Sequence, residues 1–157
     1  MTIRPELHFH KMHGAGNDFV LLDLRQQAWQ MNAADLGRFA RRLADRRRGI
    51  GCDQLLFLHP AQQTGHAVRY EIRNPDGSQA GQCGNGARCI ALYLDTIGEA
   101  GSGNLTLESP SGPVHVIRCT DGEYQVDMGR PAFDPGLVPI SMNSDNGRYQ
   151  LDSPVGT

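Results

Sequence analysis

Short apolar or alternating runs, separated by turn residues, dominate the pattern of hydrophobic and polar positions along the chain. In chain order, the runs are LHFHKM, DFVLLDL, DQLLFLHP, HAVRYEIRNP, LTLES, PVHVIR and YQVDMG. Runs of this length predict β-strands, and the PSG and TDG sequences between the last three predict hairpins. The chain is therefore expected to consist mostly of strands.

Two segments have helical spacing instead. The first begins at Asn32, a predicted N-cap, has apolar residues at helical spacing from Leu36 to Leu43, and is expected to end at Gly49. This helix is predicted to be amphipathic and to cover one face of a sheet. The arginine run 46–48 at its end would complement the helix dipole, and we interpret it as a solvated, stabilising feature without a ligand.

The second helix is predicted from about Asn85 to Ile97, before Gly98. Its surface is apolar nearly all round, with only a thin polar strip at Arg88 and Asp95, so it is expected to be surrounded by protein. A buried helix among many short strands predicts an α+β fold in which a mixed or antiparallel β-sheet is curled around that central helix.

The length of the chain limits what it can bury. With 157 residues and 39% hydrophobic content, it can form one core and the beginning of another. Residues 1–127 are predicted to form a first lobe that carries Cys83. Residues 128–157 are rich in Pro, Gly, Ser and Asn, with strand candidates LVPIS and RYQLD. They are predicted to be a linker and the opening strands of an incomplete second lobe.

Charge and cysteine content narrow the class of protein. A formal net charge of -2 gives no basic bias toward nucleic acid or lipid head groups, so neither is an expected partner. No stretch approaches the length of a membrane span, and the N-terminal residues lack the apolar middle of a signal peptide, so we expect a soluble, cytoplasmic protein. In that reducing compartment the four cysteines are expected to be free thiols.

Cys83 is the candidate for chemistry. It precedes Gly-Asn-Gly at the start of the second predicted helix, where unpaired N–H groups and the helix dipole favour a thiolate. That position makes it a candidate base or nucleophile, and the N–H groups of Gly84, Asn85 and Gly86 would suit a carboxylate or phosphate. A packing role remains the alternative for Cys83, because buried free cysteines usually pack, and packing is the prediction for Cys89.

Metal and nucleotide sites are not predicted. Cys83 and Cys89 would lie about 240° apart around one helix, and Cys52 and Cys119 have no ligand neighbours at zinc-finger spacing. The GQCGNGAR segment lacks the Lys-Ser/Thr of a P-loop and the third glycine of a dinucleotide fingerprint. The histidines of LHFHKMH are interpreted as structural, with His8 and His10 on one strand face and His13 near the site.

Four motifs, taken together, carry a family resemblance. They are, in order, KMHGAGNDFVLLD, GIGCDQLLFL, YEIRNPDGSQAGQCGNGARC and VDMGRPAF. The sequence resembles the diaminopimelate epimerases, enzymes of lysine and cell-wall precursor synthesis that work without pyridoxal phosphate. The resemblance covers nearly all of the chain to residue 133 and is most specific in the cysteine segment, since related proline racemases carry differently composed cysteine loops. The alanine of HGAG and the proline of NPDGS depart from the family pattern, but neither position has an assigned role.

The resemblance implies roles that composition and spacing do not show. It implies that Cys83 is one of two catalytic cysteines and that no cofactor is used. The implied substrate contacts are the side chains of Asn17, Gln54 and Asn74 and the backbone N–H groups of Gly84 and Asn85. From the residues alone, the two asparagines would be assigned to turns and the glutamine to a strand start. Amides do suit an amino acid, because they offer both donors and acceptors without net charge.

The implied activity is the interconversion of LL- and meso-diaminopimelate by two-cysteine acid/base proton transfer at the α-carbon. The expected partner is this small amino-acid substrate, with a homodimer as an open alternative. The family's second cysteine lies in a similar loop in a second half, and Cys119 ends a strand without such a loop, so the chain alone is expected to be inactive. Two alternatives stay open, namely an epimerase of another amino acid such as histidine and a non-catalytic anion-binding module.

Overall fold

The computed structural model describes residues 6–25, 32–101 and 103–131. In this part of the chain, eight strands form one sheet in the order β1-β2-β3-β4-β6-β7-β8, with β5 beside β4. The elements are β1 (His10–Gly14), β2 (Asn17–Asp23), α1 (Ala33–Ala44), β3 (Gln54–His59), β4 (Val68–Arg73), β5 (Gln79–Ala80), α2 (Gly84–Thr96), β6 (Asn104–Ser109), β7 (Gly112–Arg118) and β8 (Tyr124–Val126).

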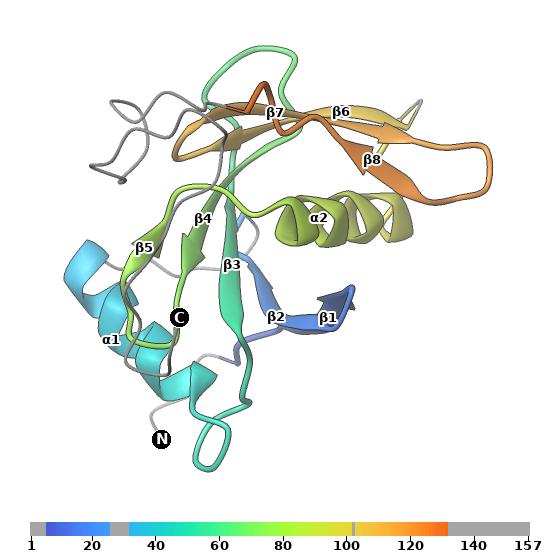
Figure 1. Cartoon of the computed structure of the whole chain (residues 1–157). Coiled ribbons are helices and arrows are strands. Elements are labelled where there is room, and N and C mark those ends of the chain that lie inside the picture. The colour runs from blue at the N-terminus through green and yellow to red at the C-terminus, as the bar shows by residue number, and fades with distance from the viewer. Residues whose placement is uncertain (1–5, 26–31, 102, 132–157) are drawn as a thin grey trace, which may run out of the picture.

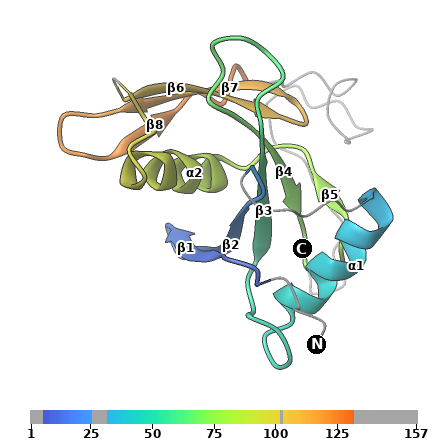
Figure 2. The same ribbon diagram turned by 180° about the vertical axis from the view of Figure 1, so that it is seen from behind.

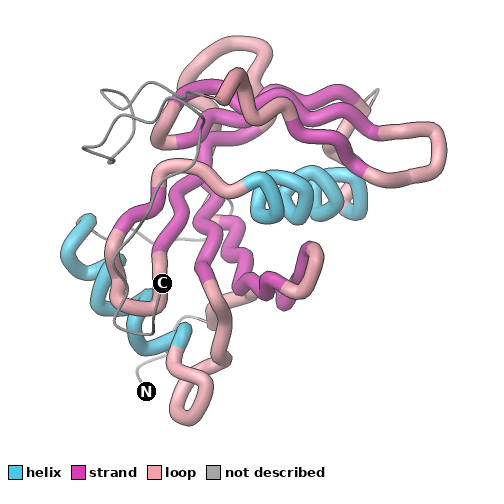
Figure 3. Tube along the Cα trace, in the orientation of Figure 1, coloured by secondary structure: helices cyan, strands magenta, loops and turns pink. Residues whose placement is uncertain are grey.

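The sheet is mixed and curls around α2. Strands β2 and β3 are parallel, as are β4 and β6, and the other neighbours are antiparallel. The curvature brings α2 against β1 and β2 on one side and against β7 and β8 on the other (Figure 1; Figure 3). This arrangement confirms the predicted α+β fold with a central helix.

Strands β2 and β3 are buried on both faces. From β2, Phe19 and Leu21 face the core under α2, whereas Val20 and Leu22 face the core under α1. Strand β3 alternates in the same way between the two cores. Helix α1 thus covers the face of the sheet away from α2 (Figure 2). Burial on both faces explains why these two runs are apolar throughout rather than alternating.

Helix α1 has the predicted N-terminus but ends earlier than predicted. The side chain of Asn32 accepts a hydrogen bond from the backbone of Asp35, as an N-cap should. The helix stops at Ala44, short of Gly49. The carboxylate of the next residue, Asp45, accepts hydrogen bonds from the backbone N–H groups two and three residues further along the chain (2.8 and 3.0 Å). An aspartate that binds nearby backbone in this way competes with helical hydrogen bonds.

Helix α2 agrees with the prediction at both ends to within one residue. Cys83 is its N-cap, and the chain leaves the helix through Gly98, which has a φ of 78°. The N–H of Gly98 donates to the carbonyl of Asp95 (3.0 Å) and that of Glu99 to the carbonyl of Leu94 (2.8 Å), the two bonds of the glycine-containing motif that commonly ends helices.

The expectation that α2 is surrounded by protein is only partly right. Leu92 and Ile97 have 46% and 40% of their surface exposed. The cause lies in the sheet, since β1 and β8 are its two edges and are not paired with each other in the described residues. A cleft of ≈ 630 Å³ lies along this open side, lined by His13, Gly14, Ala15, Arg88, Cys89, Leu92, Glu123 and Tyr124.

The histidines near the N-terminus are arranged differently from the prediction. Strand β1 begins at His10, so His8 is not on it and the two do not share a strand face. The ring of His10 packs against Tyr93 of α2 with the ring centroids 4.7 Å apart, which fits the predicted structural role. His13 is exposed and lines the cleft beside α2.

The structure describes only the first residues of the predicted linker. The strand candidates LVPIS and RYQLD, and most of the predicted linker, lie outside the described residues. The proposed lobe boundary after residue 127 therefore stays a prediction.

Among the described residues, neither helix has the length and apolar character needed to cross a membrane.

Gly77 provides a test of how closely α1 packs on the turn after β4. Its φ is +81°, and a Cβ placed there would lie 2.5 Å from the carbonyl oxygen of Gly37 in α1. Gly65 has a similar φ of +84° but open space around it. We expect Gly65→Ala to lower the free energy of unfolding by about 1 kcal/mol through backbone strain. Gly77→Ala should lower it by about 3 kcal/mol, because a clash adds to the strain.

Urea denaturation of the two variants and the wild type, followed by circular dichroism, measures the difference. Equal losses in both variants would show that the contact between Gly77 and α1 is not tight.

Candidate active site

The sheet topology brings three predicted amide side chains to the edge of the sheet at which β2 and β3 begin and β4 ends. Asn17 begins β2 and Gln54 begins β3, and these strands run parallel with Phe19 opposite Gln54. Asn74 follows the end of β4, which is antiparallel to β3. Two strand starts and one strand end therefore meet at the same edge, although the three residues are far apart in sequence.

Gln54 and Asn74 form a direct contact. Gln54 Nε2 donates to Asn74 Oδ1 (2.9 Å), and Asn74 Nδ2 donates to Ser78 Oγ (3.1 Å). The hydroxyl of Ser78 in turn donates to the carboxylate of Asp76 (2.6 Å), which also accepts from the Ser78 backbone. These bonds fix the side-chain amide of Asn74 in the NPDGS turn, so the segment does more than change the direction of the chain.

Asn17 is positioned by a tight hairpin. Ala15 and Gly16, with φ values of 53° and 85°, form the two-residue turn between β1 and β2, and positive φ at both positions is typical of a type I′ turn. Asn17 is the first residue after this turn. Its Nδ2 donates to Asp53 Oδ2 (3.1 Å), on the segment that leads into β3.

Cys83 lies at the N-terminus of α2 and contacts Asn17. Its Sγ accepts a hydrogen bond from the N–H of Gly86 (3.5 Å) and lies 3.8 Å from Asn17 Oδ1, to which the thiol can donate. The sulfur is therefore placed between a donor that suits a thiolate and an acceptor that suits a thiol. An acid/base group has to exist in both forms, and this arrangement supports both.

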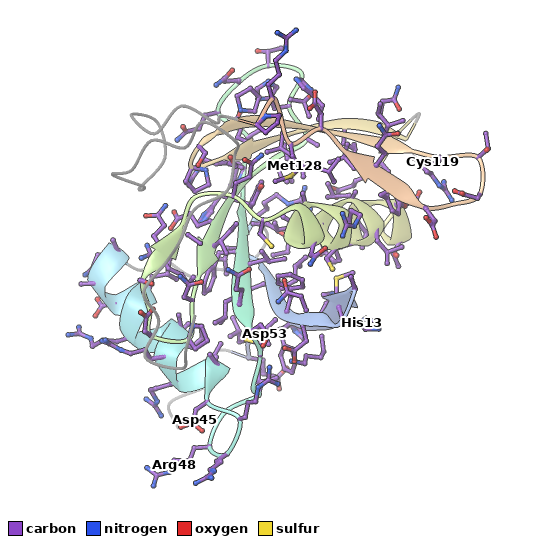
Figure 4. The ribbon with its side chains drawn as sticks, in the orientation of Figure 1. His13, Asp45, Arg48, Asp53, Cys119 and Met128 are labelled. Carbon is purple, nitrogen blue, oxygen red and sulfur yellow. The ribbon has the colours of Figure 1, made fainter. Side chains whose placement is uncertain are left out.

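The first N–H groups of α2 are available to a ligand. Within the described residues, the N–H groups of Gly84 and Asn85 have no hydrogen-bond acceptor, as expected for the first turn of a helix. Such groups form a site for an anion. Met128, labelled in Figure 4, approaches from beyond β8, and a Cβ on Gly84 would lie 3.0 Å from its sulfur. The glycine therefore leaves room for the Met128 side chain beside the start of the helix.

A cluster of charges beside Asn17 was missed by the sequence analysis. Arg46 donates to the carboxylates of both Asp18 (2.7 Å) and Asp53 (2.8 Å), and Lys11 donates to Asp18 (2.7 Å). The arginine run is exposed, as predicted, but Arg46 also bridges two carboxylates, which the prediction did not include. The signal was present as an aspartate beside the site amide in both GND and CDQ, but sequence alone did not pair them with the arginine.

The charges keep both carboxylates ionised. The hydrogen bonds from Arg46 hold the pKa of Asp18 well below its usual value, with a further contribution from Lys11. The pKa of Asp53 is also lowered, first by the backbone N–H of Asp18 and then by the amide of Asn17. At neutral pH, Asn17 therefore has a charged acceptor.

The other cysteines do not join Cys83. Cys89 is buried in the core under α2, which confirms its predicted packing role. Cys119 follows β7 at the hairpin that leads to β8, away from the N-terminus of α2 (Figure 4). In the described part of the chain, no group of three or more His, Cys, Asp or Glu side chains is arranged to hold a metal ion.

Comparison with known proteins identifies the family. The sequence profile described as diaminopimelate epimerase matches residues 9–133. The chain belongs to the diaminopimelate epimerase family. The resemblance carried by the four motifs is thereby confirmed. Diaminopimelate epimerase is an amino-acid epimerase, that is, an isomerase, of lysine biosynthesis.

The curated relatives that this chain matches are longer than the chain itself. It is 45% identical over 141 residues to a diaminopimelate epimerase of Xylella fastidiosa (strain M12), covering 89% of this chain and 48% of that one. The match to the Alkalilimnicola ehrlichii enzyme is 42% over 149 residues and covers 94% and 52%. The chain thus spans about half the length of the curated relatives it matches.

A solved structure supports the fold of the family. The hydroxyproline epimerase of Agrobacterium vitis, solved with trans-4-hydroxy-L-proline bound, superposes with a TM-score of 0.59. The two chains are 18% identical, and the match covers 78% of this chain and 40% of that one. At this identity the likeness concerns the fold.

Thiol reactivity offers a direct test of the site geometry. With iodoacetamide at about pH 8, we expect Cys83 and Cys119 to be labelled in the folded chain and Cys52 and Cys89 to stay unmodified. Burial raises the pKa of the Cys89 thiol to about 11 and also raises that of Cys52. Both buried residues therefore lack thiolate as well as access to the reagent.

Mass spectrometry of the digested chain gives the extent of labelling at each cysteine. Chain unfolded in urea is the control, and in it all four thiols should react. Labelling of Cys89 at the rate of Cys83 in the folded chain would contradict the structure.

Proposed function

We propose that this chain forms one half of the active site of a diaminopimelate epimerase, in which Cys83 transfers a proton at the α-carbon. The observation that carries the proposal is the placement of the Cys83 sulfur at the start of α2, within reach of Asn17 and beside the available N–H groups of Gly84 and Asn85. One chemically competent thiol and one anion site are thus adjacent, as proton transfer next to a carboxylate requires.

The chemistry of inversion assigns a role to each part. Inverting an α-carbon requires a base that removes its proton from one face and an acid that delivers a proton to the other. As a thiolate, Cys83 takes the proton and becomes a thiol, and in the reverse direction its S–H proton passes to the carbanion. Negative charge that develops on the substrate carboxylate is stabilised by the N–H groups of Gly84 and Asn85.

The amide side chains are proposed to hold the substrate. Asn17, Gln54 and Asn74 line the same edge of the sheet as the start of α2. Amides can donate to a carboxylate and accept from an ammonium group, so three of them suit an α-amino acid. No cofactor is required by this scheme, because the two thiols account for both proton transfers.

The second thiol is proposed to come from a second lobe. Cys52 and Cys89 are buried, and Cys119 lies on the β7–β8 hairpin, so the described residues present one thiol at the site. The complete protein is proposed to act on LL- and meso-diaminopimelate and to be located in the cytoplasm. A homodimer that buries the open side of α2 is compatible with this proposal.

The decisive experiment follows α-proton exchange in deuterated water together with stereochemical inversion, with LL-diaminopimelate and L-histidine as separate substrates. A protein that joins this chain to a second lobe should invert only diaminopimelate, and the 157-residue chain alone should invert neither. Inversion at a rate proportional to the concentration of the isolated chain would disprove the need for a second lobe. Inversion of histidine by the two-lobed protein would instead assign the substrate to the alternative.

Cysteine variants of the two-lobed protein test the assigned role. Cys83→Ala should lower kcat by about 10²–10⁴-fold, and Cys83→Ser should restore little, because a hydroxyl is a far weaker base than a thiolate. Cys89→Ala is the matched control from the same helix, which should retain activity and lose about 1 kcal/mol of stability. Unchanged turnover in Cys83→Ala would remove Cys83 from the mechanism and favour a site that only binds anions.

A further inference from the structure

The carboxylate of Asp53 determines which end of the Asn17 amide faces Cys83. Asn17 Nδ2 donates to Asp53 Oδ2 (3.1 Å), and a carboxylate can only accept. The amide oxygen is therefore left for Cys83, whose Sγ lies 3.8 Å away. A reversed amide would turn its NH₂ group to the sulfur and would stabilise the thiolate instead of the thiol.

Asp53 is itself held in place by reciprocal bonds to Asp18. The N–H of Asp18 donates to Asp53 Oδ2 (2.9 Å), and the N–H of Asp53 donates to Asp18 Oδ1 (2.9 Å). This pairing brings two carboxylates together at the starts of β2 and β3. Their mutual repulsion has to be offset by nearby cations.

Arg46 supplies most of that compensation. Its Nη2 donates to Asp18 Oδ1 (2.7 Å) and to Asp53 Oδ1 (2.8 Å), and its Nη1 donates to Asp18 Oδ2 (3.1 Å). Lys11 adds a second positive charge at Asp18. Two cations thus face two anions, and Arg46 connects the turn after α1 to both strand starts.

We propose that Asp53 and Arg46 are positioning residues that hold the amide oxygen of Asn17 toward Cys83 and so favour the protonated, proton-delivering form of its thiol. The proposal rests on the acid/base function proposed above for Cys83. Neither residue touches the sulfur, and both act through Asn17.

A purely structural role would not require this geometry. The side chain of Arg46 is 58% exposed, so its replacement should remove little packing around α1. Arg47 follows in the same turn, is also exposed, and provides a matched control of equal charge. Any effect specific to Arg46 therefore comes from the carboxylates that it bridges.

The test measures the rate of Cys83 alkylation by iodoacetamide near neutral pH in the 157-residue chain, with Cys119 as the internal reference. Loss of one weak hydrogen bond from the thiol to the amide oxygen corresponds to about a threefold rise in rate. Asp53→Asn should raise the rate by at least this factor, and Arg46→Gln should raise it by less. Arg46→Lys should restore a rate near that of the wild type, and Arg47→Gln should leave it unchanged. Circular dichroism melting curves verify that each variant is folded.

The sign of the Arg46→Gln effect separates positioning from a simple electrostatic field. Removing a nearby positive charge would by itself disfavour the thiolate and slow alkylation, whereas release of the Asn17 amide speeds it. Asp53→Asn removes a negative charge, so the field and the positioning effect have the same sign there. A slower reaction in Arg46→Gln would therefore overturn the proposal.

A double-mutant cycle makes the dependence on Asn17 explicit. Asn17→Ala removes the acceptor and should raise the alkylation rate by itself, and Asp53→Asn should then add only the smaller effect of the lost negative charge. Additive effects of the two changes would show that Asp53 does not act through Asn17. Because alkylation needs no turnover, these results stand even if the two-lobed protein fails to invert any amino acid.

Discussion

The close approach of α2 to the middle of the sheet is the contact on which the rest of the site depends. A Cβ on Gly86 would lie 3.1 Å from a methyl carbon of Leu56 in β3, a tight contact that a larger residue could make only if the Leu56 side chain shifted. The N-terminus of α2 is thereby placed at the edge where β2 and β3 begin. Cys83, as the residue that precedes the helix, comes within reach of Asn17 for that reason.

Burial of the central strands explains why the polar groups gather at that edge. Strands β2 and β3 have apolar cores on both faces, so amides and charges are accommodated only where the strands start or end. Each polar side chain there has a partner. Gln54 pairs with Asn74, Asn17 pairs with Asp53, and the carboxylates pair with Arg46. A site satisfied in this way is rigid before any substrate arrives.

The open side of the sheet leaves part of α2 uncovered in the described residues. Its edge strands β1 and β8 flank α2 without pairing with each other in the described part of the chain, and Leu92 is left exposed between them. The relatives in the family are about twice as long as this chain. The described residues place one thiol at the start of α2, whereas inversion at a carbon requires both a base and an acid.

The sequence by itself determined the elements and the candidate thiol, because those depend on local chemistry. Asn32 caps α1, Cys83 caps α2, and apolar runs form the central strands, as periodicity and capping preferences predict. The family resemblance named Asn17, Gln54 and Asn74, whose local patterns indicated only turns and a strand start. Their meeting at one edge follows from the parallel pairing of β2 with β3, which no short motif encodes.

Only the tertiary structure decided the surroundings of that thiol. Arg46 looked like one member of a solvated run, and it became a bridge because the turn after α1 returns to the starts of β2 and β3. Likewise, α2 looked apolar nearly all round, yet Leu92 is exposed because the sheet does not close around it in the described residues. Both outcomes depend on contacts between residues distant in sequence, and the energies of such contacts are set by geometry that composition and spacing do not contain.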